Sequence, residues 1–217
     1  MNFRNILAIE SAIGDGSLSL LLNGDDGLVE ISRSGASRAE KVLTEIGEIL
    51  RAASISKNDL DLIAVSIGPG SYSGIRIGIS TALGLSHALS IPLTGISALE
   101  ALAGSVAAEK VIALVPIGKS DFAWQLFTAD REGKKQAPAD PALDSIATLS
   151  DSLSVHPDLP VVVPRYCFES IKHTEGEGRE IIDAGSNLAS AIAQMAFEKR
   201  ENAPDLKPIY MRSAVAR

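Results

Sequence analysis

LDLIAVSIGPGSYSGIRIGISTALGLSHAL, which runs from Leu60 to Leu89, carries the clearest structural pattern of this chain. Its first part, Leu60 to Ile67, has the mostly apolar pattern and the length of a buried strand. A glycine loop, Gly68–Gly74, ends this run, and Ile75 to Leu89 is then apolar around nearly its whole circumference. The succession of strand, glycine loop and buried helix predicts an α/β fold built from layers of helix and sheet.

The glycine loop is suited to either of two roles, and the sequence leaves both open. Glycine lets the backbone approach a ligand closely, and the first N–H groups of a helix favour an anion. Gly68, Gly70 and Ser71 are therefore candidate remnants of a nucleotide-binding site. The loop lacks the spacing of a dinucleotide-binding motif, because Gly74 comes one position too late, and it lacks the lysine of a P-loop. The alternative is a structural turn into a tightly packed helix.

The helix after this loop carries a stripe of small residues that recur every four positions: Gly74, Gly78, Ala82 and Ser86. We predict that the stripe and an amphipathic helix over residues 36–53 form a surface for a partner subunit. An Ala82→Arg change is then expected to abolish pairing without unfolding the chain. The alternative is that the 36–53 helix of the same chain covers the stripe. The residues that this helix contributes to the predicted interface are Val42, Ile46 and Ile49.

Paired apolar runs on either side of the central stretch predict two hairpins. Ile6–Ile9 and Ser17–Leu22 form the first, and Lys110–Val115 and Phe122–Thr128 form the second, which opens a second lobe. Residues 131–157 are weakly periodic and are expected to form a loop and a short helix near Leu143–Leu153. The later elements expected are strands at Val161–Val163 and Glu180–Asp183, a helix that begins after Ser186, and an extended piece at Ile209–Met211.

Composition restricts what the chain can do. A net charge of −7 and a pI near 5.0, without a run of basic residues, disfavour unaided tight binding to nucleic acid. Aromatic residues make up 4%, so the capacity to stack exposed bases is small. A single cysteine, Cys167, fits a reducing compartment. The first apolar run ends at Glu10, too soon for a signal peptide or a membrane span. We expect a cytoplasmic location without membrane contact.

Several segments resemble the TsaB (YeaZ) family. The longest is Ser66–Gly78, which contains the string Gly-Pro-Gly-Ser-aromatic-x-Gly-x-Arg-x-Gly, far more specific than a lone glycine motif. The likeness is strong in the N-terminal half and weak in the middle. It returns at Pro208–Arg212, which is similar to the Pro-x-Tyr-Leu-Arg segment that closes the family's sequences. The other matching segments are Ile6–Ala12, Gly84–Leu85, Ile91–Leu93 and Gly95–Ala103.

The resemblance implies two ribonuclease-H-like lobes of the actin, sugar-kinase and Hsp70 kind, the second lobe being reduced. This agrees with the two hairpins predicted from the residues themselves. We expect an N-terminal lobe over residues 1–108 and a smaller lobe over residues 109–185. A C-terminal helix and tail, residues 186–217, are expected to pack back on the first lobe.

For function, the resemblance implies a non-catalytic relative of TsaD, the subunit that transfers threonylcarbamoyl to the adenosine beside the anticodon of tRNA (t6A modification). It implies that the chain pairs with itself as a homodimer and, in competition, with a TsaD-type subunit, which it activates. A TsaE-type ATPase is expected to join the complex. No cofactor is expected on the chain alone, and ATP or ADP in the partner complex stays open. Contact with tRNA is expected only through the partners.

The metal-binding histidines of TsaD have no counterpart here. Alignment of its H-x-x-x-H segment puts Ala98 and Leu102 at those positions, and neither side chain can bind a metal. The three histidines of the chain, His87, His156 and His173, lack the spacing of ligands. We therefore expect no metal site and no catalytic residue.

Other positions depart from the family pattern. Glu10 stands where members commonly carry Asp, Arg38–Glu40 where they carry His-Ser-Glu, and Pro116–Lys119 near a usual Asp-Ala-Arg. In actin-like ATPases, acids on both hairpins hold magnesium and phosphates. The missing second acid weakens the alternative function, an actin-fold ATPase or kinase acting alone. Glu10 remains a candidate for the nucleotide-binding remnant, and capping of nearby backbone is its other interpretation.

Overall fold

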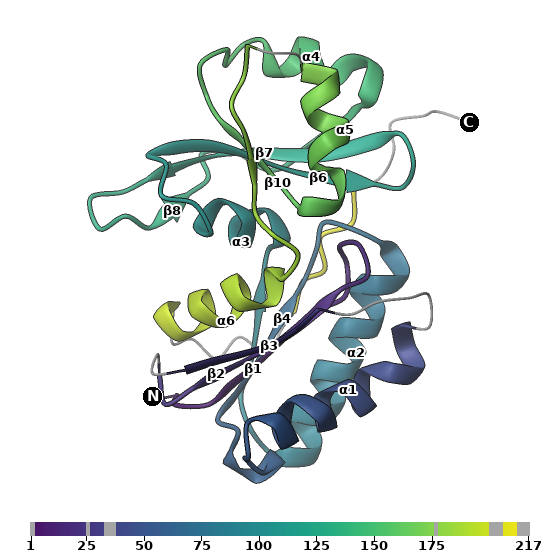
Figure 1. Cartoon of the computed structure of the whole chain (residues 1–217), viewed down its shortest axis with the longest axis vertical. Coiled ribbons are helices and arrows are strands. Elements are labelled where there is room, and N and C mark those ends of the chain that lie inside the picture. The colour runs from purple at the N-terminus through teal and green to yellow at the C-terminus, as the bar shows by residue number, and fades with distance from the viewer. Residues whose placement is uncertain (1–2, 25–26, 33–37, 176–177, 200–205, 212–217) are drawn as a thin grey trace.

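The computed structural model describes residues 3–24, 27–32, 38–175, 178–199 and 206–211. Two β-sheets lie one above the other, and helices cover their faces (Figure 1). The first sheet has five strands in the order β3-β2-β1-β4-β5. The second has the order β11-β10-β6-β7-β8, and β9 pairs with β7 beside this path. The α/β architecture predicted from the central stretch is thus present in both lobes.

The first sheet is covered by helices on both faces. α1 (Arg38–Ala52) and α2 (Tyr72–Leu89) lie on one face, and α6 (Leu188–Lys199) lies on the other (Figure 1). Every residue of the central strands β1 and β4 is therefore buried, which explains why both read as continuous apolar runs. A short 3₁₀ helix, η1 (Lys57–Asp59), leads into β4. The strands are β1 (Ile6–Glu10), β2 (Ser17–Leu22), β3 (Gly27–Ser32), β4 (Leu62–Ser66) and β5 (Leu93–Ile96).

Helix α6 follows the second lobe in sequence but packs on the first sheet. At its start, the backbone N–H of Ala189 donates to the hydroxyl of Ser17 on β2 (3.0 Å). At its end, Lys199 forms an ion pair with Glu100 (2.9 Å) on α3 (Ala98–Gly104), the helix that lies between the two sheets (Figure 1). Both ends of α6 are thus held by contacts between residues that lie far apart in the sequence, 172 positions at its start and 99 at its end.

The second lobe has its own core on the outer side of its sheet, where α4 (Ile146–Leu153) and α5 (Arg165–Glu175) pack (Figure 1). Arg179 stabilises the segment after α4, because its guanidinium donates to the carbonyl groups of Leu153 (2.8 Å), His156 (2.7 Å) and Leu159 (3.0 Å). The strands are β6 (Lys110–Ile117), β7 (Asp121–Ala129), β8 (Lys135–Gln136), β9 (Ala142–Ser145), β10 (Val161–Val163) and β11 (Ile181–Asp183).

Both predicted hairpins are confirmed, as β1–β2 and β6–β7. The edge strand β3 was missed, because a short alternating segment gives a weak signal. Two short strands, β8 and β9, occupy part of the region expected to be loop, and the helix expected there is α4. The predicted helix 36–53 is described from Arg38 onward, so residues 36 and 37 lie outside the described residues, as does Arg212 of the closing segment.

Candidate functional site

The glycine loop is packed between two other segments of the chain. A Cβ atom at Gly70 would lie 2.6 Å from the carbonyl oxygen of Ala12 in the β1–β2 loop, so no side chain fits there. Gly68 has φ of +94°, and a Cβ atom on it would lie 2.7 Å from the carbonyl oxygen of Ile209. Close approach of backbone to backbone requires glycine at both positions. These contacts fit the structural-turn alternative.

Ser71 lies within the glycine loop and caps α2. Its backbone N–H donates to the carbonyl of Ala12 (2.8 Å), and its hydroxyl accepts a hydrogen bond from the N–H of Gly74 (3.3 Å). A serine at this position satisfies one of the unpaired N–H groups of the first helical turn. The hydroxyl and the backbone of Ser71 therefore both serve the start of α2.

The carboxylate of Glu10 is held by hydrogen bonds from the backbone. Glu10 is 1% exposed, and its Oε1 accepts hydrogen bonds from the N–H groups of Ala12 (2.6 Å) and Ile13 (2.8 Å). These bonds compensate for the burial of the charge and fix the β1–β2 loop. Of the two interpretations of Glu10, backbone capping is the one that the structure shows. Glu10, Gly70 and Ser71 all meet at Ala12, which places three predicted remnant residues together.

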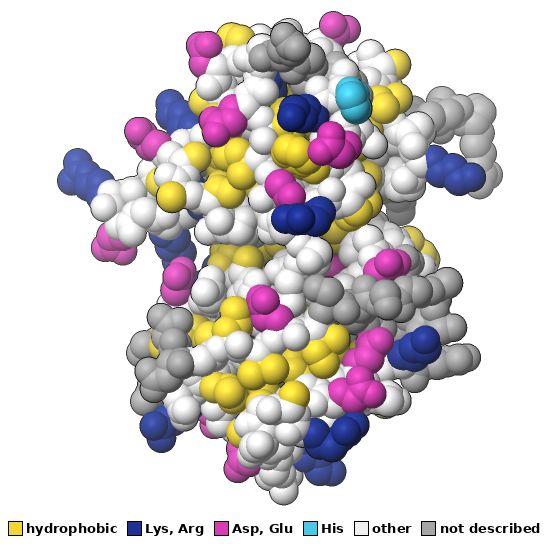
Figure 2. All heavy atoms as spheres, viewed as in Figure 1, with side chains coloured by type: hydrophobic (Ala, Val, Ile, Leu, Met, Phe, Trp, Pro, Cys, Tyr) yellow, Lys and Arg dark blue, Asp and Glu magenta, His cyan; other side chains and the backbone are white. Residues whose placement is uncertain are grey.

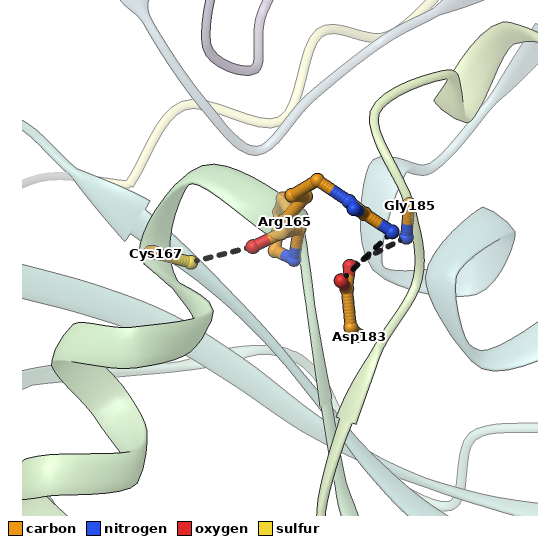
Figure 3. Close-up of polar contacts among 5 residues, drawn as sticks. Arg165, Cys167, Asp183 and Gly185 are labelled. Carbon is orange, nitrogen blue, oxygen red and sulfur yellow. Dashed lines mark hydrogen bonds and ion pairs between the residues drawn. The ribbon is translucent and has the colours of Figure 1, made fainter.

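A cavity of about 410 Å³ lies between the lobes, where the β1–β2 loop meets the start of α5. Glu10 and Gly14 line its first-lobe side, and Arg165, Tyr166 and Gly185 line the other. Figure 3 shows the carboxylate of Asp183 beneath the Arg165 guanidinium, with which it forms an ion pair of 3.1 Å. It also accepts the N–H of Gly185 (2.7 Å). The charged groups on the second-lobe side thus pair with one another.

Cys167 lies beside this cavity but is not a reactive thiol. Its Sγ donates to the carbonyl of Pro164 (3.2 Å; Figure 3). The residue is 7% exposed, and burial raises the pKa of the thiol to about 12. The thiol therefore stays protonated at neutral pH and behaves as a packing residue.

The small-residue stripe of α2 faces the interior of its own chain. Gly74, Gly78 and Ala82 are buried, and a Cβ atom on Gly78 would lie 2.5 Å from the hydroxyl of Ser11. That hydroxyl donates to the carbonyl of Gly74 (2.8 Å). The segment that approaches Gly74 and Gly78 is therefore Ser11, directly after β1, with the side chain of Val65 on β4 also near Gly78. Ser86, the last residue of the stripe, donates to the carbonyl of Ile91 (2.6 Å) and so fastens the end of the helix.

The three predicted interface residues of α1 also point inward. Val42, Ile46 and Ile49 are 0%, 4% and 0% exposed and belong to the core of the first lobe. Six of the seven residues predicted for the interface, all except the half-buried Ser86, are therefore buried in this chain. Their apolar or small character serves the chain's own core, which corrects the prediction of which faces of α1 and α2 a partner would meet.

The outward faces of the same helices carry different residues, which the periodicity did not single out. Leu43 on α1 is 61% exposed and Leu83 on α2 is 45% exposed. Gly47 on α1 and Gly84 on α2 stand in mid-helix, and a Cβ atom on either would have no described atom within 4 Å. A signal was present in the sequence, since Leu83 and Gly84 lie directly beside the predicted stripe residue Ala82.

The residues weighed as metal ligands lie far from a ligand-like arrangement. Ala98 and Leu102 are buried in α3, at 0% and 1% exposure. His87 and His173 lie exposed on different helices, and His156 is half-buried. Among the residues that the structure describes, no three His, Cys, Asp or Glu side chains are grouped so that they could hold a metal ion.

Two surface properties bear on binding. On the face shown in Figure 2, lysine and arginine side chains stand singly among acidic ones over both lobes, in keeping with a net charge of −7. In the described parts of the chain, no helix combines the length and the apolar character needed to cross a membrane.

Two α/β lobes with a cavity between them are an arrangement that actin-like proteins share. Residues 34–210 match the family model described as "TsaD: tRNA N6-adenosine threonylcarbamoyltransferase". The chain therefore belongs to the TsaD family.

Curated relatives narrow the comparison to TsaB. The tRNA threonylcarbamoyladenosine biosynthesis protein TsaB of Escherichia coli K12 is 30% identical over 134 residues, 59% of this chain and 57% of the relative. TsaB of Buchnera aphidicola subsp. Baizongia pistaciae is 30% identical over 136 residues, 60% of this chain and 61% of the relative. The chain spans less than two thirds of the length of these relatives. The resemblance to TsaB predicted from the sequence is confirmed.

Solved structures confirm the fold. YeaZ from Pseudomonas aeruginosa superimposes with a TM-score of 0.75 at 19% identity, covering 96% of this chain and all of that one (100%). Component A of the (R)-2-hydroxyglutaryl-CoA dehydratase of Acidaminococcus fermentans gives a TM-score of 0.53 at 13% identity, covering 90% of this chain and 98% of that one. The predicted pair of actin-like lobes is therefore present.

Proposed function

We propose that this chain is a non-catalytic subunit that binds and activates a TsaD-type enzyme, so that threonylcarbamoyl is transferred to the adenosine beside the anticodon of tRNA. Membership of the TsaD family and the likeness to TsaB support this role. The chain would pair either with itself or with the TsaD-type subunit, and a TsaE-type ATPase would join the complex. The proposed place of action is the cytoplasm.

The observation that carries the proposal is the outward face of α1 and α2. Each helix presents one large, exposed leucine, Leu43 and Leu83, beside a mid-helix glycine. Glycine within a helix costs about 1 kcal/mol relative to alanine, and no described atom of the chain needs the space at Gly47 or Gly84. A partner helix that packs closely against both positions would make use of that space and would cover the leucines.

The side chains in the interior of the chain support a non-catalytic role. The carboxylate of Glu10 is engaged by the N–H groups of Ala12 and Ile13. The positions aligned with the TsaD histidines hold Ala98 and Leu102, whose side chains pack in the core. We propose that this chain alone binds no cofactor and that ATP or ADP, where required, binds in the complex with the partners.

The proposal is tested by light scattering after size-exclusion chromatography, with the chain alone and mixed with the TsaD homologue of the same organism. A threonylcarbamoyl transfer assay on tRNA, with and without the chain, follows. We expect a stoichiometric complex and transfer that depends on the chain. Absence of a complex, together with ATP hydrolysis by the chain alone, would instead support an actin-fold ATPase.

A further inference from the structure

All three tyrosines of the chain line one groove. Tyr72 lies in the first turn of α2, Tyr166 in α5, and Tyr210 in the C-terminal segment, and together they border a hollow of about 580 Å³. Their side chains are 60%, 55% and 43% exposed. The whole chain has nine aromatic residues: one tryptophan, three tyrosines and five phenylalanines. Because aromatic residues are so few, an aromatic-rich surface does not explain why all three tyrosines lie at one groove.

The rings are held in place by contacts from three separate segments. The N–H of Ile209 donates to the carbonyl of Ile67 (2.8 Å), which anchors the C-terminal segment beside the glycine loop. Tyr210 then lies with its ring centroid 5.0 Å from that of Tyr72, at an interplanar angle of 44°. The guanidinium of Arg76 lies over the Tyr72 ring, 5.4 Å from its centroid. The two tilted rings and the guanidinium therefore contact one another at the edge of the groove.

The groove differs in charge from the rest of the chain. Aspartate and glutamate number 27, yet none of the described residues that line the groove is acidic. Its polar groups are the hydroxyls of Ser71 and Ser73, the tyrosine hydroxyls and backbone, and Arg76 brings a positive charge to the Tyr72 ring. The aromatic faces suit a planar ligand that can stack on them, and the Arg76 guanidinium suits a negatively charged group beside it.

We propose that this groove binds an unstacked base of an RNA, which stacks on Tyr72 or Tyr210 while Arg76 faces the adjoining phosphate. The inference rests on the proposed function, in which the chain meets tRNA inside a complex. Aromatic faces with a nearby guanidinium are the usual platform for single-stranded bases. The low aromatic content predicted no such platform and only indirect contact with tRNA, but folding brings the tyrosines together.

A partner protein is the weaker explanation for this groove. The exposed leucine of α2 that we assign to the partner, Leu83, lies eleven residues beyond Tyr72, about 16 Å along the helix axis. The groove is concave and is formed jointly by both lobes and the C-terminal segment, which suits a small planar group better than the side of a helix. The two surfaces can therefore be tested separately.

The test is ultraviolet cross-linking of an anticodon stem–loop RNA to the full chain, alone and in the complex, followed by mass spectrometry of the linked peptides. We expect links at Tyr72 or Tyr210. In binding assays with the complex, we expect Tyr72→Ala and Tyr210→Ala to weaken RNA affinity about tenfold each. Tyr72→Phe and Tyr210→Phe should retain affinity, because the ring remains. His87→Ala, an exposed change at the far end of α2, is the control.

Several results would overturn the inference. Unchanged affinity in both alanine variants would remove the groove from RNA binding, and equal losses in the phenylalanine variants would exclude stacking. Competition by ATP at the same site would assign the groove to a free nucleotide. Light scattering is measured before RNA is added, so loss of the complex in Tyr72→Ala would assign the groove to the partner protein. If the wild-type chain formed no complex with the TsaD-type subunit, the proposed function would be contradicted. Cross-linking of the RNA to the chain alone would still test whether the groove binds a base.

Discussion

The two faces of α2 contain similar small residues, but they meet different surroundings. On the inward face, Gly74 and Gly78 let the backbone and side chain of Ser11 approach the helix closely. On the outward face, Gly84 has no described atom near its missing side chain and stands beside the exposed Leu83. Contacts within the chain explain the small residues of the inward face only. We therefore look to a partner for an explanation of the glycine on the outward face.

The largest effect should come from a charge on the inward face. Ala82 is 0% exposed, so in Ala82→Arg a guanidinium must enter the core without a partner or force the helix away from the sheet. We expect a loss above about 4 kcal/mol, a large share of the roughly 5–15 kcal/mol by which native proteins are stable, and therefore a strongly lowered melting temperature. The sequence alone predicted that this variant stays folded, and the burial of Ala82 argues against that prediction. Circular dichroism and thermal melting measure it, and a melt close to that of the wild type would contradict the inward assignment.

A smaller change on the same face should also destabilise the chain. In Gly74→Ala the new methyl group would collide with the backbone of Ser11, which cannot move without displacing β1. We expect a loss of about 3 kcal/mol in the free energy of unfolding, measured by urea denaturation. If the variant were as stable as the wild type, the contact between α2 and the end of β1 would be looser than the structure shows.

On the outward face, a charge should affect association rather than folding. Leu83→Arg places a guanidinium at a position that is already 45% exposed, so the melting temperature should change little. Binding to the TsaD-type partner should weaken by about 2 kcal/mol, roughly thirtyfold, because the charge would have to be buried at the interface. Ile146→Arg, at a position 46% exposed on the second lobe, is the matched control. Equal loss of binding in both variants would contradict the assignment of this face.

The smallest effect should be a gain in stability. Gly84→Ala adds a methyl group where no described atom lies within 4 Å, so the isolated chain should be stabilised by up to about 1 kcal/mol. Gly74→Ala is the same substitution on the other face and should have the opposite sign. A destabilised Gly84→Ala chain would show that this glycine has a role within the chain after all.

The elements of the fold were largely predictable, while the environment of the candidate site was not. Both hairpins, the α/β class and the run of strand, glycine loop and helix follow from apolar runs and their period, which depend on local chemistry. Glu10 could be found as a candidate from its place at a strand end. Its hydrogen bonds to Ala12 and Ile13 depend on the turn of the β1–β2 loop, which periodicity does not describe.

By itself, the sequence determined that one helix of this chain follows a glycine loop, that the helix has small residues on one side, and that the chain resembles TsaB. Only the tertiary structure shows which side of the helix faces inward. The spacing of residues in the sequence shows which of them share one face of the helix, but not which face packs against the sheet. The inward face is fixed by the contact of Gly74 with Ser11, 63 residues away in sequence. The meeting of Tyr72, Tyr166 and Tyr210 has the same origin, since only folding brings three distant segments to one groove.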